Sequence, residues 1–341
     1  MSSFDFKKIK FLSKKQVLND VLGIHLTTDS IALLRLKKIA GVISVSDAEI
    51  FEHGAIVKDK EDSITSRIPS YMKAKYASVA YASENSLIKL LNFPRVVDSR
   101  TEKQIAADLG IEEAKTYRLG YTIVPSEGKS ESSFVEVALP VEELNTVNEY
   151  FSQHLPAASC IGISHLGLIN AYAMCVKKSK SSEVVAILNF EPSNTALFVF
   201  KGNKLIFLRI FRTGMDVFTE EIAKLMGISK ATVNGIICEN AFDVSSQVKA
   251  TFKSFVHQVN LCLDFVERKE KIVVEKIKLS GSSEMVSEFV GEFTSFFVPK
   301  IEMFDPFESF EIAEGAFKNF EDKRWRYATA YGVALALLEV D

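Results

Sequence analysis

The sequence has little cysteine and no apolar run long enough to cross a bilayer. Its cysteines, Cys160, Cys175, Cys238 and Cys262, are scattered, with no CxxC pair and no secretory leader before them. Such thiols are typical of reduced cytosolic proteins, in which cysteine packs as a small hydrophobic residue. A membrane span needs about 18 to 20 consecutive apolar residues. We therefore expect a soluble protein.

Signature motifs of several enzyme classes are also missing. There is no P-loop, no GxGxxG and no GxSxG elbow. The histidines make no HxxxH or HExxH pair, so we expect no metal site; they are His25, His53, His154, His165 and His257. His165 is interpreted as a buried, hydrogen-bonded side chain. A net charge of −3 gives no reason to expect nucleic acid as a partner.

The length and composition of the chain are those of an ordinary globular protein that is too long for one small core. It has 341 residues, of which 47% are hydrophobic and 25% charged, so we expect about two lobes. Most of the 26 phenylalanines should fill cores. Some between residues 290 and 310 are expected to stay on the surface as a contact patch. Asp305–Pro306–Phe307 is interpreted as a structural turn anchored by Phe307.

The first half of the chain begins as a strand meander with turns near Thr28 and Gly41, followed by a helical segment at Ser63–Tyr71 and strands at 76–82 and 86–94. An insertion follows. Ser99 and Glu102 have capping-box spacing, and Gly110 ends the helix. A hairpin with a polar tip at 126–133 and a helix from 141 complete it.

The second half opens with a strand at 184, a hairpin over Gly202–Asn203 and a helix ended by Gly227. A long helix follows, with His257 on its wet side and a helically spaced apolar stripe formed by Val248, Phe252, Phe255, Val256, Val259, Cys262, Leu263 and Val266. A strand, turn and helix over 276–293 and an alanine-rich last helix complete the half.

A strand–turn–strand unit occurs twice, 164 residues apart. In "IHLTTDSIALL" (24–34) and "LNFEPSNTALF" (188–198), His25 aligns with Asn189, Asp29 with Ser193 and Ala32 with Ala196. A long-period duplication predicts two similar lobes. The two hairpin turns would line a cleft, with Gly281 in "LSGSS" on a third turn.

These motifs resemble the PilM family, actin-like cytoplasmic proteins of type IV pilus machinery that are similar to the cell-division protein FtsA. The resemblance runs from about residue 20 to 340. It rests on "VLGIHLTTDSIALLRL", "LLNFPRVVDSRTEKQIAADLGI", "ILNFEPSNTALFVFKGNKLIFLRIFRTGMDVFTEEIAKLMGIS", "IKLSGSSEMVSEF" and "FDPFE", which follow one another in family order.

The resemblance implies an α/β, actin-like (ribonuclease H-like) fold with two lobes and a small inserted subdomain. The expected division is a basic amphipathic tail (1–18), a first lobe (19–89), the insertion (90–155), a return to the first lobe (156–180), a second lobe (181–322) with a helical subdomain at about 226–270, and a C-terminal helix (323–341) packed on the first lobe.

The resemblance also implies a nucleotide cleft, and the residues that match it have changed. The family's magnesium-holding Asp is His25, a nitrogen ligand, whereas Mg²⁺ prefers oxygen. The second carboxylate position is Asn189, and a glycine position holds Glu191, followed by Pro192, which has no N–H. The residues expected at the cleft, with no catalytic and no metal-binding residue among them, are Thr28, Ser30, Asn189, Ser193, Thr195, Gly214 and Gly281.

Two functions remain open at this point. The first is a scaffold without enzymatic activity at the inner face of the cytoplasmic membrane. It would bind the N-terminal cytoplasmic tail of a PilN-like membrane protein through the insertion, with pilus motor ATPases as further partners and a degenerate nucleotide cleft. The second is an actin-like ATP-binding protein or weak ATPase that gates assembly. We expect no cofactor, or weak binding of ATP and Mg²⁺, and no hydrolysis.

The first eighteen residues interleave basic and large apolar side chains: Lys7, Lys8, Lys10, Lys14 and Lys15 alternate with Phe4, Phe6, Ile9, Phe11 and Leu12. Such a pattern favours contact with an anionic membrane surface. A frayed, soluble tail is the alternative interpretation.

Overall fold

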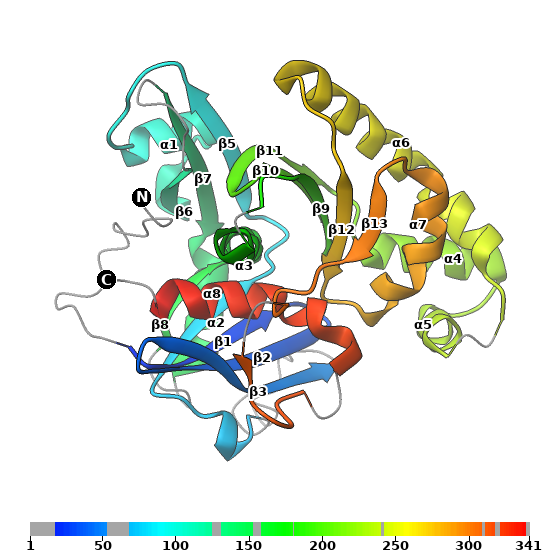
Figure 1. Cartoon of the computed structure of the whole chain (residues 1–341), viewed down its shortest axis with the longest axis horizontal. Helices are drawn as coiled ribbons and strands as arrows, with labels where there is room; N and C mark the ends of the chain where they lie inside the picture. Colours follow the sequence, from blue (N-terminus) through cyan, green and yellow to red (C-terminus); the bar gives the residue numbers. More distant parts are fainter. Residues whose placement is uncertain are drawn as a thin grey trace. The chain divides into compact units, whose positions relative to one another are not determined.

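The computed structural model describes residues 18–52, 68–124, 131–152, 158–179, 181–239, 242–308, 311–317 and 321–338. The chain divides into two compact units (Figure 1). Unit 1 comprises Met1–Lys180 and Pro306–Asp341, and unit 2 comprises Ser181–Asp305. The second lobe therefore ends earlier than the predicted residue 322. Phe307, already in unit 1, packs against Phe317 and Tyr331, with ring centroids 5.1 and 5.0 Å away.

Unit 1 is built on a six-stranded sheet in the order β14-β3-β2-β1-β4-β8. The strands β1, β2 and β3 form the predicted antiparallel meander, and β4 and β8 continue it in parallel with β1. The bounds are β1 Asp20–Leu26, β2 Ser30–Ile39, β3 Val42–Glu52, β4 Tyr76–Tyr81, β8 Ala158–Ile163 and β14 Glu311–Ile312.

Unit 2 repeats this arrangement in a five-stranded sheet in the order β11-β10-β9-β12-β13. Here β9, β10 and β11 form the antiparallel meander, and β12 and β13 run parallel to β9. The bounds are β9 Val184–Phe190, β10 Thr195–Lys201, β11 Lys204–Phe211, β12 Lys276–Gly281 and β13 Lys300–Met303.

The two meanders have the same strand register. His25 pairs with Ala32 in unit 1, and Asn189 pairs with Ala196 in unit 2. Both turns are closed by the same backbone bond, since Thr27 N–H donates to Ser30 O at 3.0 Å and Glu191 N–H to Asn194 O at 2.9 Å. The repeat seen in the sequence is therefore a repeat of backbone geometry.

Unit 1 is covered by two helices, α3 (Ser164–Ser179) and α8 (Ala328–Leu338), which lie side by side (Figure 1). The alanine-rich α8 is buried along almost its whole length, as close packing requires. A Cβ on Gly332 would collide with the carbonyl oxygen of Gly167 in α3, and a Cβ on Gly23 in β1 would collide with that of Ala330. The backbones themselves are in contact.

The insertion is a three-stranded sheet in the order β5-β7-β6, with helices between and after its strands in the sequence. Its elements are β5 Leu87–Phe93, α1 Glu102–Leu109, η3 Ala114–Thr116, β6 Tyr117–Val124, β7 Ser132–Pro140 and α2 Val141–Ser152. The insertion thus begins at 87 rather than 90. The capping box predicted at Ser99 and Glu102 is wrong, because Thr101 and Gln104 form it. Gly110 ends the helix as predicted, at φ 73°.

The helices of unit 2 begin earlier than the predicted helical subdomain at 226–270. They start with α4 at Met215 and are α4 Met215–Met226, α5 Lys230–Cys238, α6 Ser245–Glu270, η4 Glu284–Phe289 and α7 Val290–Phe296. The whole predicted stripe of α6 is buried, and His257 is exposed. Phe190 lies within 6.4 Å of four phenylalanine rings, those of Phe218, Phe252, Phe255 and Phe293.

The surface patch expected at residues 290–310 is not formed by most of the phenylalanines described there; Phe296 is half-buried, and Phe310 lies outside the described side chains. Phe293, Phe297 and Phe304 are at most 6% exposed. Of the expected helix at 63–71, residues 63–67 lie outside the described part, and Ser70–Met72 is a single 3-10 turn. The basic tail also lies outside it, apart from the buried Leu18. Within the described ranges, no helix is long and apolar enough to cross a membrane.

We predict that Gly332→Ala lowers the unfolding free energy of unit 1 by about 1–3 kcal/mol, because the added methyl must push α8 away from α3. Trp325, the chain's single tryptophan, is 5% exposed in unit 1 and reports its unfolding by fluorescence in urea. Gly162→Ala is the matched control, because no atom lies within 4 Å of the position that its Cβ would take. An unchanged midpoint for Gly332→Ala would contradict this account of the packing.

Candidate functional site

In unit 1, the turn after β1 is closed by its own side chains. Thr27 Oγ1 donates to Asp29 Oδ1 at 2.6 Å and accepts the Ser30 N–H at 2.9 Å. Ser30 Oγ also donates to Asp29 Oδ1, at 3.2 Å. The Ser30 hydroxyl, expected to face an oxyanion, is therefore engaged with a carboxylate. Thr28 is exposed beside it.

In unit 2, the equivalent turn holds a buried carboxylate. Glu191 is 0% exposed, and Asn189 Nδ2 donates to its Oε1 at 2.9 Å. Asn189 is itself 0% exposed at the end of β9. A carboxylate and a phosphate at about 4 Å repel by about 4 kcal/mol at an effective dielectric of about 20. The turn is thus electrostatically unfavourable for a phosphate group.

The first backbone N–H groups of α4 also donate hydrogen bonds to this turn. Met215 N–H donates to Glu191 O at 3.0 Å, and Asp216 N–H donates to Pro192 O at 2.9 Å. Helix N-termini can bind anions through such amides, but here carbonyl groups of the chain accept them. Gly214 permits the contact, because a Cβ there would lie 2.5 Å from Glu191 O.

The remaining residues expected at the cleft also make contacts within unit 2. Thr195 Oγ1 donates to Thr213 O at 2.8 Å, and Ser193 Oγ accepts from Asn194 Nδ2 at 3.3 Å. A Cβ on Gly281 would collide with Phe190 O, which accepts the Ser282 N–H at 3.2 Å. Gly281 therefore allows the end of β12 to lie against β9.

The structure brings together the five expected residues of unit 2 at one end of its sheet, and Thr28 and Ser30 in the turn of unit 1. It adds Asp29, which the sequence did not single out as a site residue. The stretch T-T-D-S carried the signal, since Thr, Asp and Ser often close turns with their own side chains. His25, at the family's metal-ligand position, is 2% exposed. No group of three potential metal-ligating side chains occurs among the residues described.

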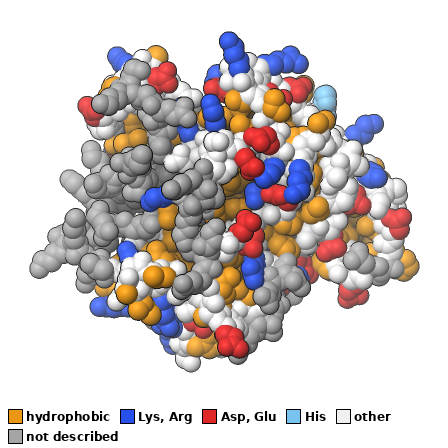
Figure 2. All heavy atoms as spheres, in the orientation of Figure 1, with side chains coloured by type: hydrophobic (Ala, Val, Ile, Leu, Met, Phe, Trp, Pro, Cys, Tyr) orange, Lys and Arg blue, Asp and Glu red, His pale blue; other side chains and the backbone are white. Residues whose placement is uncertain are grey.

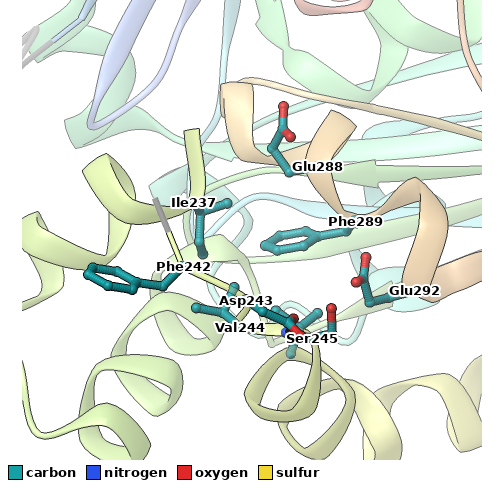
Figure 3. Close-up of a pocket in the computed structure, with 9 residues that line it drawn as sticks. Ile237, Phe242, Asp243, Val244, Ser245, Glu288, Phe289 and Glu292 are labelled. Atoms are coloured by element: carbon teal, nitrogen blue, oxygen red, sulfur yellow. Dashed lines mark hydrogen bonds between the residues drawn. The ribbon is translucent and has the colours of Figure 1, made fainter. Parts of the chain in front are cut away.

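A hollow of about 90 Å³ lies between α5, the start of α6 and η4–α7 (Figure 3). Its rim carries Asp243, Glu288 and Glu292, and Phe289 lies at its centre. The Ser245 N–H donates to Asp243 at 3.0 Å and lowers the pKa of that carboxyl. Pockets for drug-sized ligands measure about 300–1,000 Å³, so this acidic hollow is too small for a nucleotide.

A larger hollow of about 600 Å³ lies on the insertion, where η3 and the start of β6 meet the end of β7 and α2. It is lined by polar and apolar side chains: Lys115, Thr116, Tyr117, Pro140, Val141, Glu142, Asn145, Thr146 and Glu149. Among the hollows described here, this one has the volume to receive a peptide segment.

A buried ion cluster braces the sheet of the insertion. Arg100, whose side chain is 6% exposed, donates to Glu136 Oε1 at 2.6 Å and pairs with Asp108 of α1. Its guanidinium group lies 4.8 Å from the centroid of the Phe93 ring. The cluster joins the loop before α1, the helix itself and the central strand β7, which gives the insertion a fixed surface.

Comparison with known proteins identifies a family whose sequence model matches this chain. A family model described as type IV pilus assembly protein PilM matches residues 166–337 of the 341. No curated protein matches the chain by sequence.

Among solved structures, one described as the PilM–PilN type IV pilus biogenesis complex is 13% identical, with a TM-score of 0.76 over 95% of this chain and 100% of that chain. The ethanolamine utilization protein EutJ from Carboxydothermus hydrogenoformans is 10% identical, with a TM-score of 0.50 over 94% and 91%. A Bacteroides thetaiotaomicron protein with an actin-like ATPase fold is 11% identical, with a TM-score of 0.46 over 87% and 95%. The predicted actin-like α/β fold is confirmed.

We predict that Asn189→Asp destabilises unit 2, because it places two carboxylates at hydrogen-bond distance in a site without exposed surface. The expected loss is on the order of 4 kcal/mol, measured as a lower thermal midpoint by circular dichroism. The double variant Asn189→Asp/Glu191→Gln should recover most of it, since the new amide can donate to the new carboxylate. Equal midpoints for the single and double variants would contradict the interpretation.

Proposed function

The chain belongs to the PilM family of type IV pilus assembly proteins, and from that premise we propose that it is a scaffold of the assembly platform rather than an enzyme. It binds a short cytoplasmic tail of a PilN-like membrane protein on its insertion. Its two hairpin turns maintain the fold and do not support phosphate chemistry. The observation that carries this proposal is the contrast between turns closed on themselves and an open hollow on a braced insertion.

Closure of both turns argues against ATP hydrolysis. Phosphoryl transfer needs Mg²⁺ held by oxygen ligands and donors aimed at the phosphates. Asp29 accepts hydroxyls of its own turn, Asn189 bonds Glu191, and Pro192 has no N–H to donate. These residues do not fit a magnesium-bound triphosphate. The nucleotide site is therefore degenerate, with at most weak binding of ATP and Mg²⁺.

The insertion is the proposed partner surface. The solved PilM–PilN complex covers nearly the whole chain at a TM-score of 0.76, so a PilN-like partner suits this fold. An extended tail binds through backbone hydrogen bonds and pockets for alternate side chains. The hollow between η3 and α2 offers such a pocket. The Arg100–Glu136 pair anchors β7, whose last residue, Pro140, lines that hollow; a surface that is already ordered lowers the entropic cost of binding.

The same proposal implies a cellular location for the protein. A PilN-like partner would hold it at the inner face of the cytoplasmic membrane, where the basic residues 1–18 supply a second contact. Pilus motor ATPases are the further partners implied there. A type II secretion platform would present the same chemistry, and genes of pilus components beside this one would favour the pilus.

We expect calorimetry with Mg-ATP to show no saturable heat at micromolar nucleotide and a malachite-green assay to show no release of phosphate above the buffer rate. The reason is that the donors and carboxylates of both turns are engaged with the chain itself. Micromolar binding with turnover that disappears in His25→Ala or Asn189→Ala would overturn the scaffold in favour of a nucleotide-gated protein.

We expect Asn145→Trp to weaken binding of the PilN-like tail at least tenfold, a difference of about 1.4 kcal/mol, because the indole fills the hollow. Asn148→Trp is the matched control: it changes the same residue type on α2, is exposed, and lies outside the hollow. Fluorescence anisotropy of a labelled tail peptide measures both. Equal affinity of the two variants for the tail would show that the hollow is not the binding site. Absence of binding by the native chain would contradict the proposed function itself.

A further inference from the structure

We propose that the tip of the β2–β3 hairpin in unit 1 contacts an anionic lipid surface. The hairpin turns tightly over Ala40 and Gly41, at φ 51° and 85°, the signature of a type I′ turn. Ile39 and Val42 pair directly across the strands on either side of this turn. They are 69% and 50% exposed, so two branched aliphatic side chains stand together at the end of the hairpin.

The charges beside this apolar pair are positive. Residues 37–43, "KKIAGVI", contain two lysines and no carboxylate. The acid nearest in register, Asp20, lies opposite Lys37 and is held by Arg35 through two bonds of 2.7 and 2.8 Å. Among the described residues, Lys37 and Lys38 form no ion pair, so their ammonium groups are available to an external anion. Apolar side chains with lysines beside them suit the boundary between headgroups and acyl chains.

The first described residues of the chain lie at this same end of the sheet. Lys38 N–H donates to Asn19 O at 2.9 Å, so residue 19 lies beside the end of β2. The sequence before this point contains five lysines, and residues 1–17 lie outside the described part of the chain. In Figure 2, hydrophobic and basic spheres lie side by side at the lower left, the area where Figure 1 shows β1 beginning.

We assign the tip to lipid because an exposed aliphatic pair and two lysines occur together there. It rests on the membrane location in the proposed function, yet does not need the partner tail. The tip would give the protein a second point of attachment and so a fixed orientation. A protein partner would also cover apolar residues, but the two lysines beside the pair favour headgroup phosphates.

The test is sedimentation of the full chain with vesicles of phosphatidylcholine alone or with about 30 mol% phosphatidylglycerol. We expect binding only to the anionic vesicles and a decrease with added salt. Ile39→Ser/Val42→Ser and Lys37→Gln/Lys38→Gln should each reduce the sedimented fraction at least fivefold. Val96→Ser/Ile123→Ser is the matched control, because these residues are 57% and 42% exposed on the insertion of the same unit.

Native-like sedimentation of both tip variants would overturn the inference, even if the basic segment still binds lipid. A loss of self-association in the serine variant without a loss of vesicle binding would also overturn it and assign the tip to a second copy of the chain. Anisotropy with the PilN-like tail separates the two proposals: the tip variants should bind the tail normally. Failure of the native chain to bind the tail would count against the proposed function alone.

Discussion

Contact between backbones holds unit 1 together. The last helix of the chain lies on β1 and α3 so closely that Gly23, Gly167 and Gly332 have no room for a methyl group. Chain segments separated by more than a hundred residues meet there, which is why residues 306–341 return to unit 1 after the second unit is complete. The sheet that carries the meander, the hairpin tip and the insertion depends on that closure.

The two meanders share one backbone geometry, but different groups close their turns. The register of β1 with β2 is that of β9 with β10, and both turns close with the same amide-to-carbonyl bond. In unit 1 the side chains of Thr27, Asp29 and Ser30 complete the turn. In unit 2 the carbonyls of Glu191 and Pro192 receive the first amides of α4. Each solution stabilises the fold and uses groups that a phosphate site would need.

The proposed scaffold role has different physical requirements from ATP hydrolysis, and the described residues offer what binding to a partner needs. Binding a peptide needs a fixed surface with a hollow, which the Arg100–Glu136–Asp108 cluster and the hollow beside α2 supply. Attachment to a membrane needs apolar and basic groups gathered in one place, which the hairpin tip supplies. Family membership agrees with this distribution, in which residues other than those of the hairpin turns make the proposed partner contacts.

The sequence by itself determined the elements whose signals are local. The apolar stripe of α6, the turns at Gly41 and Gly202–Asn203 and the helix end at Gly110 follow from side-chain periodicity and from residues that accept left-handed backbone. The aligned hairpins also predicted both meanders. Spacing alone misplaced the start of α1, since it favoured a capping box at Ser99 and Glu102, whereas Thr101 and Gln104 form it.

Tertiary structure alone decided that Glu191 is buried against Asn189, that the phenylalanines near residue 300 turn inward, and that Asn19 meets the tip at Lys38. Those outcomes depend on how whole strands and helices pack, often between residues distant in sequence, and no local pattern encodes which partner a side chain finds.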